Sequence, residues 1–457
     1  MSRTPSRTAL QMFDEAGLRE FHWSAVLTAG MGFFTDAYDL FIIGTVTALL
    51  TPIWHLTLSQ IVLLNATALA ASAIGAVSFG ALMDRLGRKR IYGLELLLLV
   101  VGALISAASP SFMWLVAGRI IVGLGVGGDY PTSAVIMAEY ANRSRRGFLV
   151  TMVFAMQGIG LVAGPVIAAA FLASGLSHDL IWRLLLGLGT VPAASVFYLR
   201  RRISETPRFL VANGSVNEAR TVVESLTGHM AAPDRGFERQ SLLAAPYLSR
   251  LLGTAGTWFL IDVAFYGNGV SQQFILKHVL PHANILTTTL ISGAIFLVAA
   301  LPGYYVAAYF MDSLGRKTIQ VVGFLVMALS YATLFAWPAA FADVPVFIGL
   351  YLVSFFFIEF GPNATTFLLP TEVFPTKIRG LGHGLSAAAG KVGAAIGVFF
   401  LPLILAKIGI APTFGILGAV SLAGALLTIL AVPEMKQRSL CLVERPAKLL
   451  APGAQAS

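Results

Sequence analysis

Ionisable and hydrogen-bonding side chains stand inside stretches of this sequence that are otherwise apolar. Trp258, Asp262 and Tyr266 follow one another at steps of four, so a helix would carry all three along one face. Asp36 and Asp39 are three residues apart and would also share roughly one face. Ionisable groups are costly in an apolar surrounding, so each of them indicates a path for an ion or a substrate.

Other apolar stretches add further side chains of this kind: Asp129, Tyr130, Gln157, Glu359, Asn363 and Lys391. Hydroxyls, amides, an indole N–H and an ammonium can donate hydrogen bonds to the oxygens of an anion, and a carboxylate can take up and release a proton. Burial makes a carboxylate easier to protonate, so the set favours an anion carried with protons over a neutral sugar. An aspartate that accepts the P–OH proton of phosphate would also discriminate against sulfate.

The same residue types also allow structural interpretations. The two amides could be hydrogen bonds between helices that contribute about 1 kcal/mol each. Asp36 or Asp129 could instead pair with Lys391 or Arg119 as a fixed ion pair. Glu95 is interpreted as a gate or packing partner rather than as a ligand.

The composition requires a membrane around the elements that carry these residues. The chain has 457 residues, of which 57% are hydrophobic and 12% charged, and this excludes an ordinary soluble enzyme. A membrane-spanning helix needs about 20 mostly apolar residues. Twelve such windows centre on residues 25–50, 60–83, 91–109, 112–136, 148–173, 181–199, 249–270, 285–311, 318–337, 345–369, 381–406 and 411–432.

The distribution of the 31 Lys and Arg residues predicts the orientation of these spans. Apart from Arg119 and Lys391 inside spans and Arg183, Lys277 and Lys407 on the opposite side, they fall in alternate connections and in the two tails. Both termini are therefore expected in the cytoplasm of a multi-pass protein of the plasma membrane, or of the inner membrane in a bacterium. This also accounts for the net charge of +9 without a nucleic-acid partner.

Two loops recur in the two halves of the chain. Asp84-Arg85-Leu86-Gly87-Arg88-Lys89 follows the second span, and Asp312-Ser313-Leu314-Gly315-Arg316-Lys317 follows the eighth. Glu139 precedes Arg146 by the same spacing as Glu372 precedes Arg379. The sequence thus predicts an all-α membrane protein of two pseudo-symmetric six-helix bundles, residues 1–200 and 248–432, with a cytoplasmic linker, 201–247, and a tail, 433–457. A cytoplasmic gate of charged pairs is expected from these loop residues: Asp84, Arg88, Glu139, Arg146, Asp312, Arg316, Glu372 and Arg379.

The repeated loop resembles the signature of the major facilitator superfamily. Gly118-Arg119-Ile120-Ile121-Val122-Gly123, Glu205-Thr206-Pro207-Arg208-Phe209 and the run Pro433–Leu440 are similar to marks of the sugar porters. A closer resemblance, from the first span to the eleventh, is to the phosphate:proton symporter family of fungi and plants. The runs that carry it are Gly30–Leu40, Gly127–Pro131, Phe154–Gly158, Leu251–Phe259, Gly361–Phe367 and Ser386–Gly393.

That resemblance implies roles for the polar residues of the spans. Phosphate would be surrounded by Tyr130, Gln157, Trp258, Asp262, Tyr266 and Asn363. Asp36, Asp129 and Asp262 would serve the proton path, and Lys391 would assist anion binding or release. Asp39 and Glu359 are further candidates, and Glu359 stands where members of that family often carry a neutral amide.

The sequence therefore favours a symporter that imports inorganic phosphate with protons by alternating access, with phosphate, protons and the lipid bilayer as its partners. The alternatives are a proton-coupled carrier of an organic acid or organophosphate, then a sugar carrier, and outside transport a nutrient sensor. No enzyme activity, cofactor, metal or obligate protein partner is expected, because no cluster of nucleophilic or metal-binding residues stands out.

Overall fold

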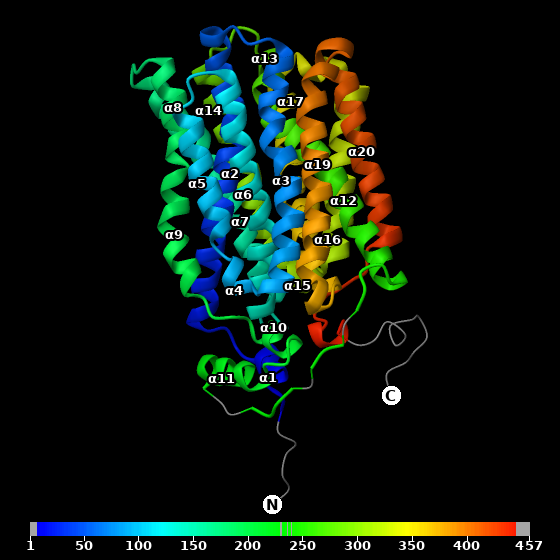
Figure 1. Ribbon diagram of the computed structural model, residues 1–457. Coiled ribbons are helices and arrows are strands. Elements are labelled where there is room, and N and C mark those ends of the chain that lie inside the picture. Colours follow the sequence, from blue (N-terminus) through cyan, green and yellow to red (C-terminus); the bar gives the residue numbers. More distant parts are fainter. Residues whose placement is uncertain (1–6, 229–230, 235, 239, 445–457) are drawn as a thin grey trace, which may run out of the picture.

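Long helices run side by side through the whole molecule in the computed structural model, which describes residues 7–228, 231–234, 236–238 and 240–444 (Figure 1). Within those residues, eleven helical segments are long and apolar enough to cross a membrane. A twelfth, α12 (Ala245–Val270), is less apolar because it carries Arg250, Asp262 and Asn268. The predicted all-helical fold of twelve spans is confirmed.

The spans of the first half, in chain order, are α2 (Glu20–Trp54), α3 (Leu58–Leu86), α4 (Arg88–Ile91) with α5 (Leu94–Ala107), α6 (Phe112–Tyr140), α7 (Arg146–Ala173), and α8 (His178–Leu188) with α9 (Thr190–Arg202). The interval expected as a linker contains two short helices, α10 (Pro207–Ala212) and α11 (Val216–Thr227). Helix α10 begins where Thr206 accepts a hydrogen bond from the Phe209 amide and Pro207 occupies the first turn.

The second half starts with α12 and the short helix α13 (Gln272–Val279). Its other spans are α14 (Ile285–Ile295) continued by η1 (Phe296–Ala300) and α15 (Leu301–Leu314), α16 (Arg316–Ala336), α17 (Val344–Ile358) continued by η3 (Glu359–Asn363) and α18 (Ala364–Val373), α19 (Thr376–Ile408) and α20 (Ile410–Ala431). The turn η2 (Pro338–Phe341) precedes α17.

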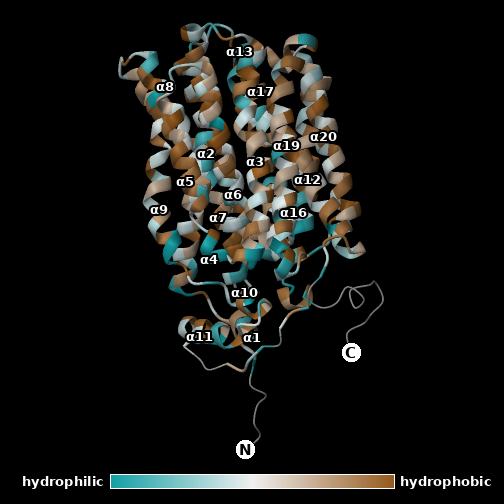
Figure 2. Ribbon diagram, in the orientation of Figure 1, coloured by the Kyte–Doolittle hydropathy of each residue, from teal (hydrophilic) through white to brown (hydrophobic). Residues whose placement is uncertain are grey.

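The two ends of the bundle differ. The first and last described elements, α1 (Ala9–Glu15) and η4 (Leu440–Leu442), lie with α10 and α11 at the lower end in Figure 1, which we call the terminal end. The opposite end, around α8 and α13, is called the loop end. Figure 2 shows hydrophobic colour along the outer helices and hydrophilic colour gathered at the terminal end. A lipid-facing surface with a charged end is what a membrane-spanning bundle requires.

The halves meet closely along α3 and α19, and α7 packs against α14 and α15. A Cβ atom on Gly80 would lie 2.3 Å from the carbonyl oxygen of Gly380, so at this position only glycine permits the observed approach. Small residues let helix backbones come together where lipid supplies no hydrophobic drive.

One span is interrupted near its middle. In η3 the backbone of Gly361 leaves helical geometry (φ −104°, ψ −115°), and Pro362 follows with no N–H to donate. The five residues of η3 form a π turn, an arrangement frequent at functional sites. The break places Glu359 and Asn363 together in the interior of the bundle.

Candidate functional site

A lysine and an aspartate form an ion pair at the centre of the second half. Lys391 Nζ on α19 lies 3.3 Å from Asp262 Oδ2 and donates a hydrogen bond of 2.9 Å to the Tyr266 hydroxyl, both on α12. The ammonium also lies 4.1 Å from the ring centroid of Tyr130 on α6. Asp262 and Tyr266 reach one cation because a step of four residues places them on one face of α12.

Hydrogen bonds extend this pair across both halves of the molecule. The Tyr266 and Tyr130 hydroxyls are 3.0 Å apart, and Gln157 Nε2 on α7 donates to the Tyr130 hydroxyl over 3.0 Å. The Tyr304 hydroxyl on α15 donates to Gln157 Oε1 over 3.0 Å. Asn363 Nδ2 in turn lies 2.7 Å from the Tyr304 hydroxyl.

The chain of contacts ends at Glu359, whose Oε2 atom accepts from Asn363 Nδ2 over 2.5 Å. We call the connected set the central network: Tyr130, Gln157, Asp262, Tyr266, Tyr304, Glu359, Asn363 and Lys391. Each of these side chains is at most 2% exposed. One cation, two carboxylates and several hydroxyl and amide groups thus share one enclosed site.

Aromatic rings cover the central network toward the terminal end. The Phe154 and Phe367 rings stack with centroids 4.2 Å apart, one from each half. Trp258 lies 5.9 Å from Tyr130 and 5.4 Å from the ring of His383, centroid to centroid. The indole ring of Trp258, one of the predicted residues, therefore packs beside the central network.

The remaining predicted acids of the spans have separate surroundings in the first half. Asp129 accepts hydrogen bonds from Arg200 Nη1 and Nη2, at 2.7 and 2.9 Å. Arg200 Nη1 also donates to Glu95 over 2.7 Å. Asp39 pairs with Arg119 at 2.7 Å. Asp36 is fully buried, and neither of its oxygens has a hydrogen-bond partner within the described part of the chain.

These contacts decide between the ion pairs that the sequence left open. Lys391 pairs with Asp262 rather than with Asp36 or Asp129, and the partner of Asp129 is Arg200. Arg200 lies near the end of α9, and the charge distribution of the sequence predicts it among the cations of the connections. That prediction is wrong for the side chain, because the guanidinium turns back into the bundle and is fully buried. The signal in the sequence for this inward position is that Arg200 is the first cation after the sixth span.

Tyr304 is the residue of the central network that the sequence reasoning missed. It is fully buried on α15 and contacts both amides that the sequence singled out, Gln157 and Asn363. In the sequence, a tyrosine in an apolar span cannot be distinguished from an aromatic residue that only packs against its neighbours. Its position directly after Pro302-Gly303 was the weak signal that set it apart.

The expected gate residues gather at the terminal end in two equivalent sets. Arg88 contacts Glu139 through Nε and Nη2 at 3.2 and 3.1 Å, and Arg316 contacts Glu372 through the same atoms at 2.9 Å each. The repeated motif therefore forms the same paired geometry in both halves. This symmetry follows from the repeated spacing of the loops.

Contacts at the terminal end also cross between the halves. The Asp84 carboxylate accepts from the amides of Gly380 and Leu381 at 3.0 and 2.8 Å. The Asp312 carboxylate accepts from the amides of Gly147 and Phe148 at the same two distances. Arg146 lies 3.9 Å from Glu372 and donates to the carbonyl of Arg438 over 2.9 Å.

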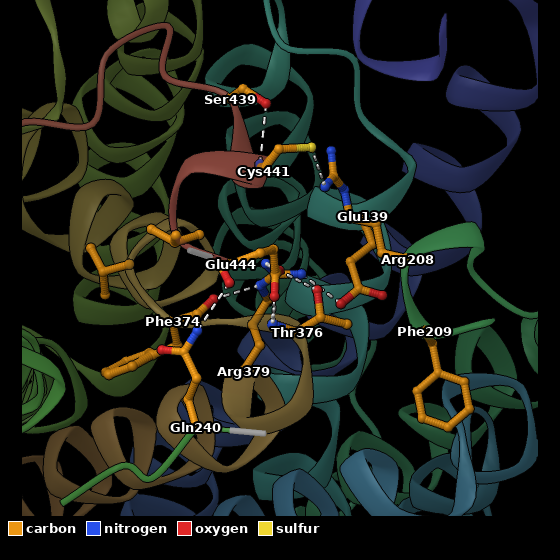
Figure 3. A network of polar contacts seen from close by, with 12 residues as sticks. Glu139, Arg208, Phe209, Gln240, Phe374, Thr376, Arg379, Ser439, Cys441 and Glu444 are labelled. Atoms are coloured by element: carbon orange, nitrogen blue, oxygen red, sulfur yellow. Dashed lines mark hydrogen bonds and ion pairs between the residues drawn. The ribbon is translucent and has the colours of Figure 1, made fainter. Parts of the chain in front are cut away.

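Two segments outside the spans complete this end, and the sequence reasoning did not foresee them. Arg379 lies between Glu139 of the first half and Glu444 of the C-terminal segment, at 2.7 and 3.2 Å (Figure 3). Asp14 on α1 contacts Arg208 Nη2 at 2.5 Å. The terminal end is therefore held together by contacts from both halves and from both ends of the described chain.

Buried charge also changes the titration of two groups in these connecting segments. Burial opposes ionisation of Asp14, but the guanidiniums of Arg208 and Arg146 outweigh it and hold the pKa of Asp14 below its ordinary value. For Glu205, burial is the larger influence and raises its pKa, although its carboxylate accepts from the amides of Arg88 and Lys89.

Among the described residues, no group of three or more His, Cys, Asp or Glu side chains is arranged to hold a metal ion. The polar atoms of the central network meet instead in the buried interior between two repeated six-helix halves. This architecture is that of a multi-pass membrane transporter of the major facilitator type.

The chain belongs to the sugar (and other) transporter family, whose sequence model matches residues 25–446. Its fold is similar to that of the proton:xylose symporter XylE bound to 6-bromo-6-deoxy-D-glucose, with a TM-score of 0.79 at 22% identity over 93% of this chain and 98% of that one. It also resembles a partially occluded inward-open conformation of the xylose transporter XylE from E. coli, with a TM-score of 0.72 at 20% identity over 92% and 100% of the two chains.

Relatives that are closer in sequence are named for a different cargo, inorganic phosphate. The chain is 38% identical to inorganic phosphate transporter 1-6 of Oryza sativa subsp. japonica over 94% of each chain. It is 35% identical to probable inorganic phosphate transporter 1-6 of Arabidopsis thaliana over 96% of each. It is 36% identical to low affinity inorganic phosphate transporter 1 of Petunia hybrida, again over 94% of each.

Proposed function

We propose that this protein imports inorganic phosphate together with protons by alternating access. The observation that carries the proposal is the composition of the central network, where Lys391 is accompanied by Asp262 and Glu359. An anion can bind to Lys391 only if the nearby carboxylates lose their negative charge. Binding of phosphate and uptake of protons are then one event.

The contacts of Lys391 suggest how this exchange occurs. In the closed structure the ammonium is held by Asp262. A proton on Asp262 frees the ammonium to bind phosphate, while Tyr130, Tyr266, Gln157 and Asn363 supply donors for the phosphate oxygens. Release of the proton restores the ion pair and expels the anion. The likeness to phosphate transporters at 35–38% identity supports phosphate as the cargo.

Further residues have assigned roles in this scheme. Asp36 and Asp129 serve proton movement through the first half, and Trp258 closes the site on one side. The charged pairs at the terminal end form a gate that opens when the halves, residues 1–200 and 248–432, rock apart. We place the terminal end in the cytoplasm and the protein in the plasma membrane, or the inner membrane of a bacterium, because cations concentrate there.

An organic acid or an organophosphate is the second candidate cargo. Glu359 favours it, because a second carboxylate in the site would weaken the binding of inorganic phosphate if it were ionised, and so indicates a changed cargo. Both candidates use the same proton-linked release of Lys391, and the transport assay distinguishes them.

The test is uptake of radiolabelled phosphate into proteoliposomes that hold the purified protein, with an imposed inward proton gradient. Gradient-driven accumulation should resist competition by sulfate, benzoate and glucose. Asp262→Asn should abolish accumulation, because the asparagine cannot carry the proton. Asp343→Asn, an exposed residue at the loop end, is the matched control. Wild-type accumulation by Asp262→Asn, or uptake of benzoate with phosphate at background, would overturn the assignment.

A further inference from the structure

The transport scheme requires the carboxylates near Lys391 to lose their charge, but its proton steps name only the aspartates and not Glu359. Glu359 begins the π turn η3, beside the non-helical Gly361, and is fully buried. Its Oε2 atom accepts from Asn363 Nδ2, whereas its Oε1 atom has no hydrogen-bond partner among the described residues. A buried oxygen without a donor is a costly arrangement for a carboxylate.

Among the described residues, no Lys or Arg side chain forms an ion pair with Glu359. The elements packed against η3 are α12, α15, α16, α17 and α18. Near the network their titratable groups are Asp262 and Tyr266 on α12, Tyr304 on α15, Tyr331 on α16 and Tyr351 on α17. The others are Tyr247 and Arg250 on α12, Tyr305, Tyr309 and Asp312 on α15, Arg316 and Lys317 on α16 and Glu372 on α18. Arg250 donates to the carbonyl of Val373, and Lys317 donates to that of Ile429. Glu372 is held by Arg316 at the terminal end. Lys391, the cation of the central network, is held by Asp262.

A proton on Glu359 resolves both problems. A neutral acid avoids the several kcal/mol that an unpaired buried charge costs. With the proton on Oε1, the Oε2 atom still accepts from Asn363. The protonated Oε1 then becomes a hydrogen-bond donor within the central network, where phosphate is proposed to bind. An ionised Glu359 would repel a bound anion at this position.

We propose that Glu359 is a proton-carrying residue of the transport cycle, in addition to the aspartates of the spans. It takes up its proton from the side that supplies phosphate, keeps it while the site is enclosed, and releases it to water when the terminal end opens. This inference rests on the proposed phosphate transport. It assigns one carried proton to a residue of η3 rather than to the aspartates alone.

The experiment counts protons taken up per phosphate bound by the purified protein in weakly buffered detergent solution, with a pH indicator dye and radiolabelled inorganic phosphate. Glu359→Gln, which imitates the protonated acid, should still bind phosphate, take up about one proton fewer per phosphate, and lose part of the decline in binding that wild type shows as pH rises. Glu359→Asp should keep the wild-type proton number. Glu218→Gln, an exposed residue on α11, is the control.

Each outcome decides the matter. If wild type binds no phosphate, the proposed function fails before Glu359 is tested. If Glu359→Gln binds phosphate with the wild-type proton number and pH profile, the proton role is overturned. If Glu359→Gln no longer binds, Glu359→Asp decides: binding with the wild-type proton number supports the proposal. Equal loss in both variants shows that only the shape of the glutamate matters and overturns it.

Discussion

Tyr304 joins the two amides of the central network, since its hydroxyl donates to Gln157 Oε1 and accepts from Asn363 Nδ2. The two amides belong to different halves, so one hydroxyl connects the halves directly at the site. Loss of this hydroxyl leaves buried amide groups without a partner, which costs about 1–3 kcal/mol.

Tyr304→Phe should therefore raise the KM for phosphate uptake by about tenfold, the factor that corresponds to 1.4 kcal/mol. The measurement is the initial rate of radiolabelled phosphate uptake into proteoliposomes over a range of concentrations. Tyr305→Phe, at the neighbouring half-buried tyrosine, is the control and should keep the wild-type KM. Equal KM values for the two variants would remove Tyr304 from the binding site.

Asp14 illustrates a residue-scale effect away from the membrane. Its carboxylate contacts Arg208, Arg146 and Ser439, at 2.5, 3.6 and 2.6 Å. Because the pKa of Asp14 lies below its ordinary value of 3.8 in the folded protein, these contacts stabilise the fold above that pH. The contribution is lost as the pH falls through the folded-state pKa.

Asp14→Asn should therefore destabilise the protein at pH 7, by about 3 kcal/mol because Arg208 is left buried without its partner. The difference from wild type should shrink as the pH falls below about 4. Thermal unfolding in detergent from pH 7 to pH 3 measures both effects. Glu15→Gln removes an exposed neighbour paired with Arg7 and should change little at any pH. A gap that is constant with pH would refute the ionic explanation.

At the scale of elements, the last turns of α3 and α15, which carry Asp84 and Asp312, contact helices of the opposite half. Helix α7 begins at Arg146. The first amide of this helix that donates to a backbone carbonyl of the same turn is that of Leu149, whose acceptor is the carbonyl of Arg145. The earlier amides of Gly147 and Phe148 need an external acceptor, which Asp312 supplies. The start of one half's helix is thus completed by the other half.

Asp312→Ala should expose these two amides. Charged hydrogen bonds contribute about 1.5–3 kcal/mol, so hydrogen exchange at Gly147 and Phe148 should accelerate by about tenfold or more. Exchange measured by mass spectrometry on the peptide that contains both amides tests this. Asp343→Ala removes an acidic N-cap of α17 at the loop end and should leave that peptide unchanged. Unchanged protection in Asp312→Ala would show that Asp312 does not hold the halves together.

At the scale of the whole molecule, the enclosed state depends on close backbone contacts at both ends. A Cβ on Gly80 would lie 2.3 Å from the Gly380 carbonyl oxygen near the terminal end. A Cβ on Gly44 would lie 2.6 Å from the Val270 carbonyl oxygen nearer the loop end. Each contact joins the two halves, so a larger side chain at either glycine is accommodated only if that end separates.

Gly80→Val should therefore shift the population toward a state open at the terminal end, and Gly44→Val toward a state open at the loop end. A shift of 1.4 kcal/mol changes the ratio of states by about tenfold. Both shifts are measured as distances between spin labels by pulsed electron paramagnetic resonance. Labels at Arg85→Cys and Ser313→Cys report the terminal end, and labels at Ser174→Cys and His282→Cys report the loop end. Cys441→Ser is the background, since Cys441 is the sole cysteine.

Gly349→Ala serves as the control, because a Cβ atom added at Gly349 would meet no atom within 4 Å. Distances that lengthen at the same end in Gly80→Val and Gly44→Val would contradict the opposed movement of the two ends.

Much of the architecture was readable from the sequence, because each span is a continuous apolar window and each repeated loop is a local pattern. The same holds for Asp262, Tyr266, Lys391 and the other polar residues of the spans, which stand out wherever apolar neighbours surround them. Both signals depend only on residues close together in the chain. The spans and most members of the central network could therefore be predicted.

Partner choice was decided by the tertiary structure alone. Whether Asp129 contacts Arg119, Lys391 or Arg200 depends on how α6, α9 and α19 are rotated and on how far a long side chain turns back. Tyr304 joined the network because α15 packs against α7 and η3. Local periodicity fixes which face of a helix is polar, but packing between distant segments sets which polar groups meet, because hydrogen bonds and ion pairs form only over a few ångströms.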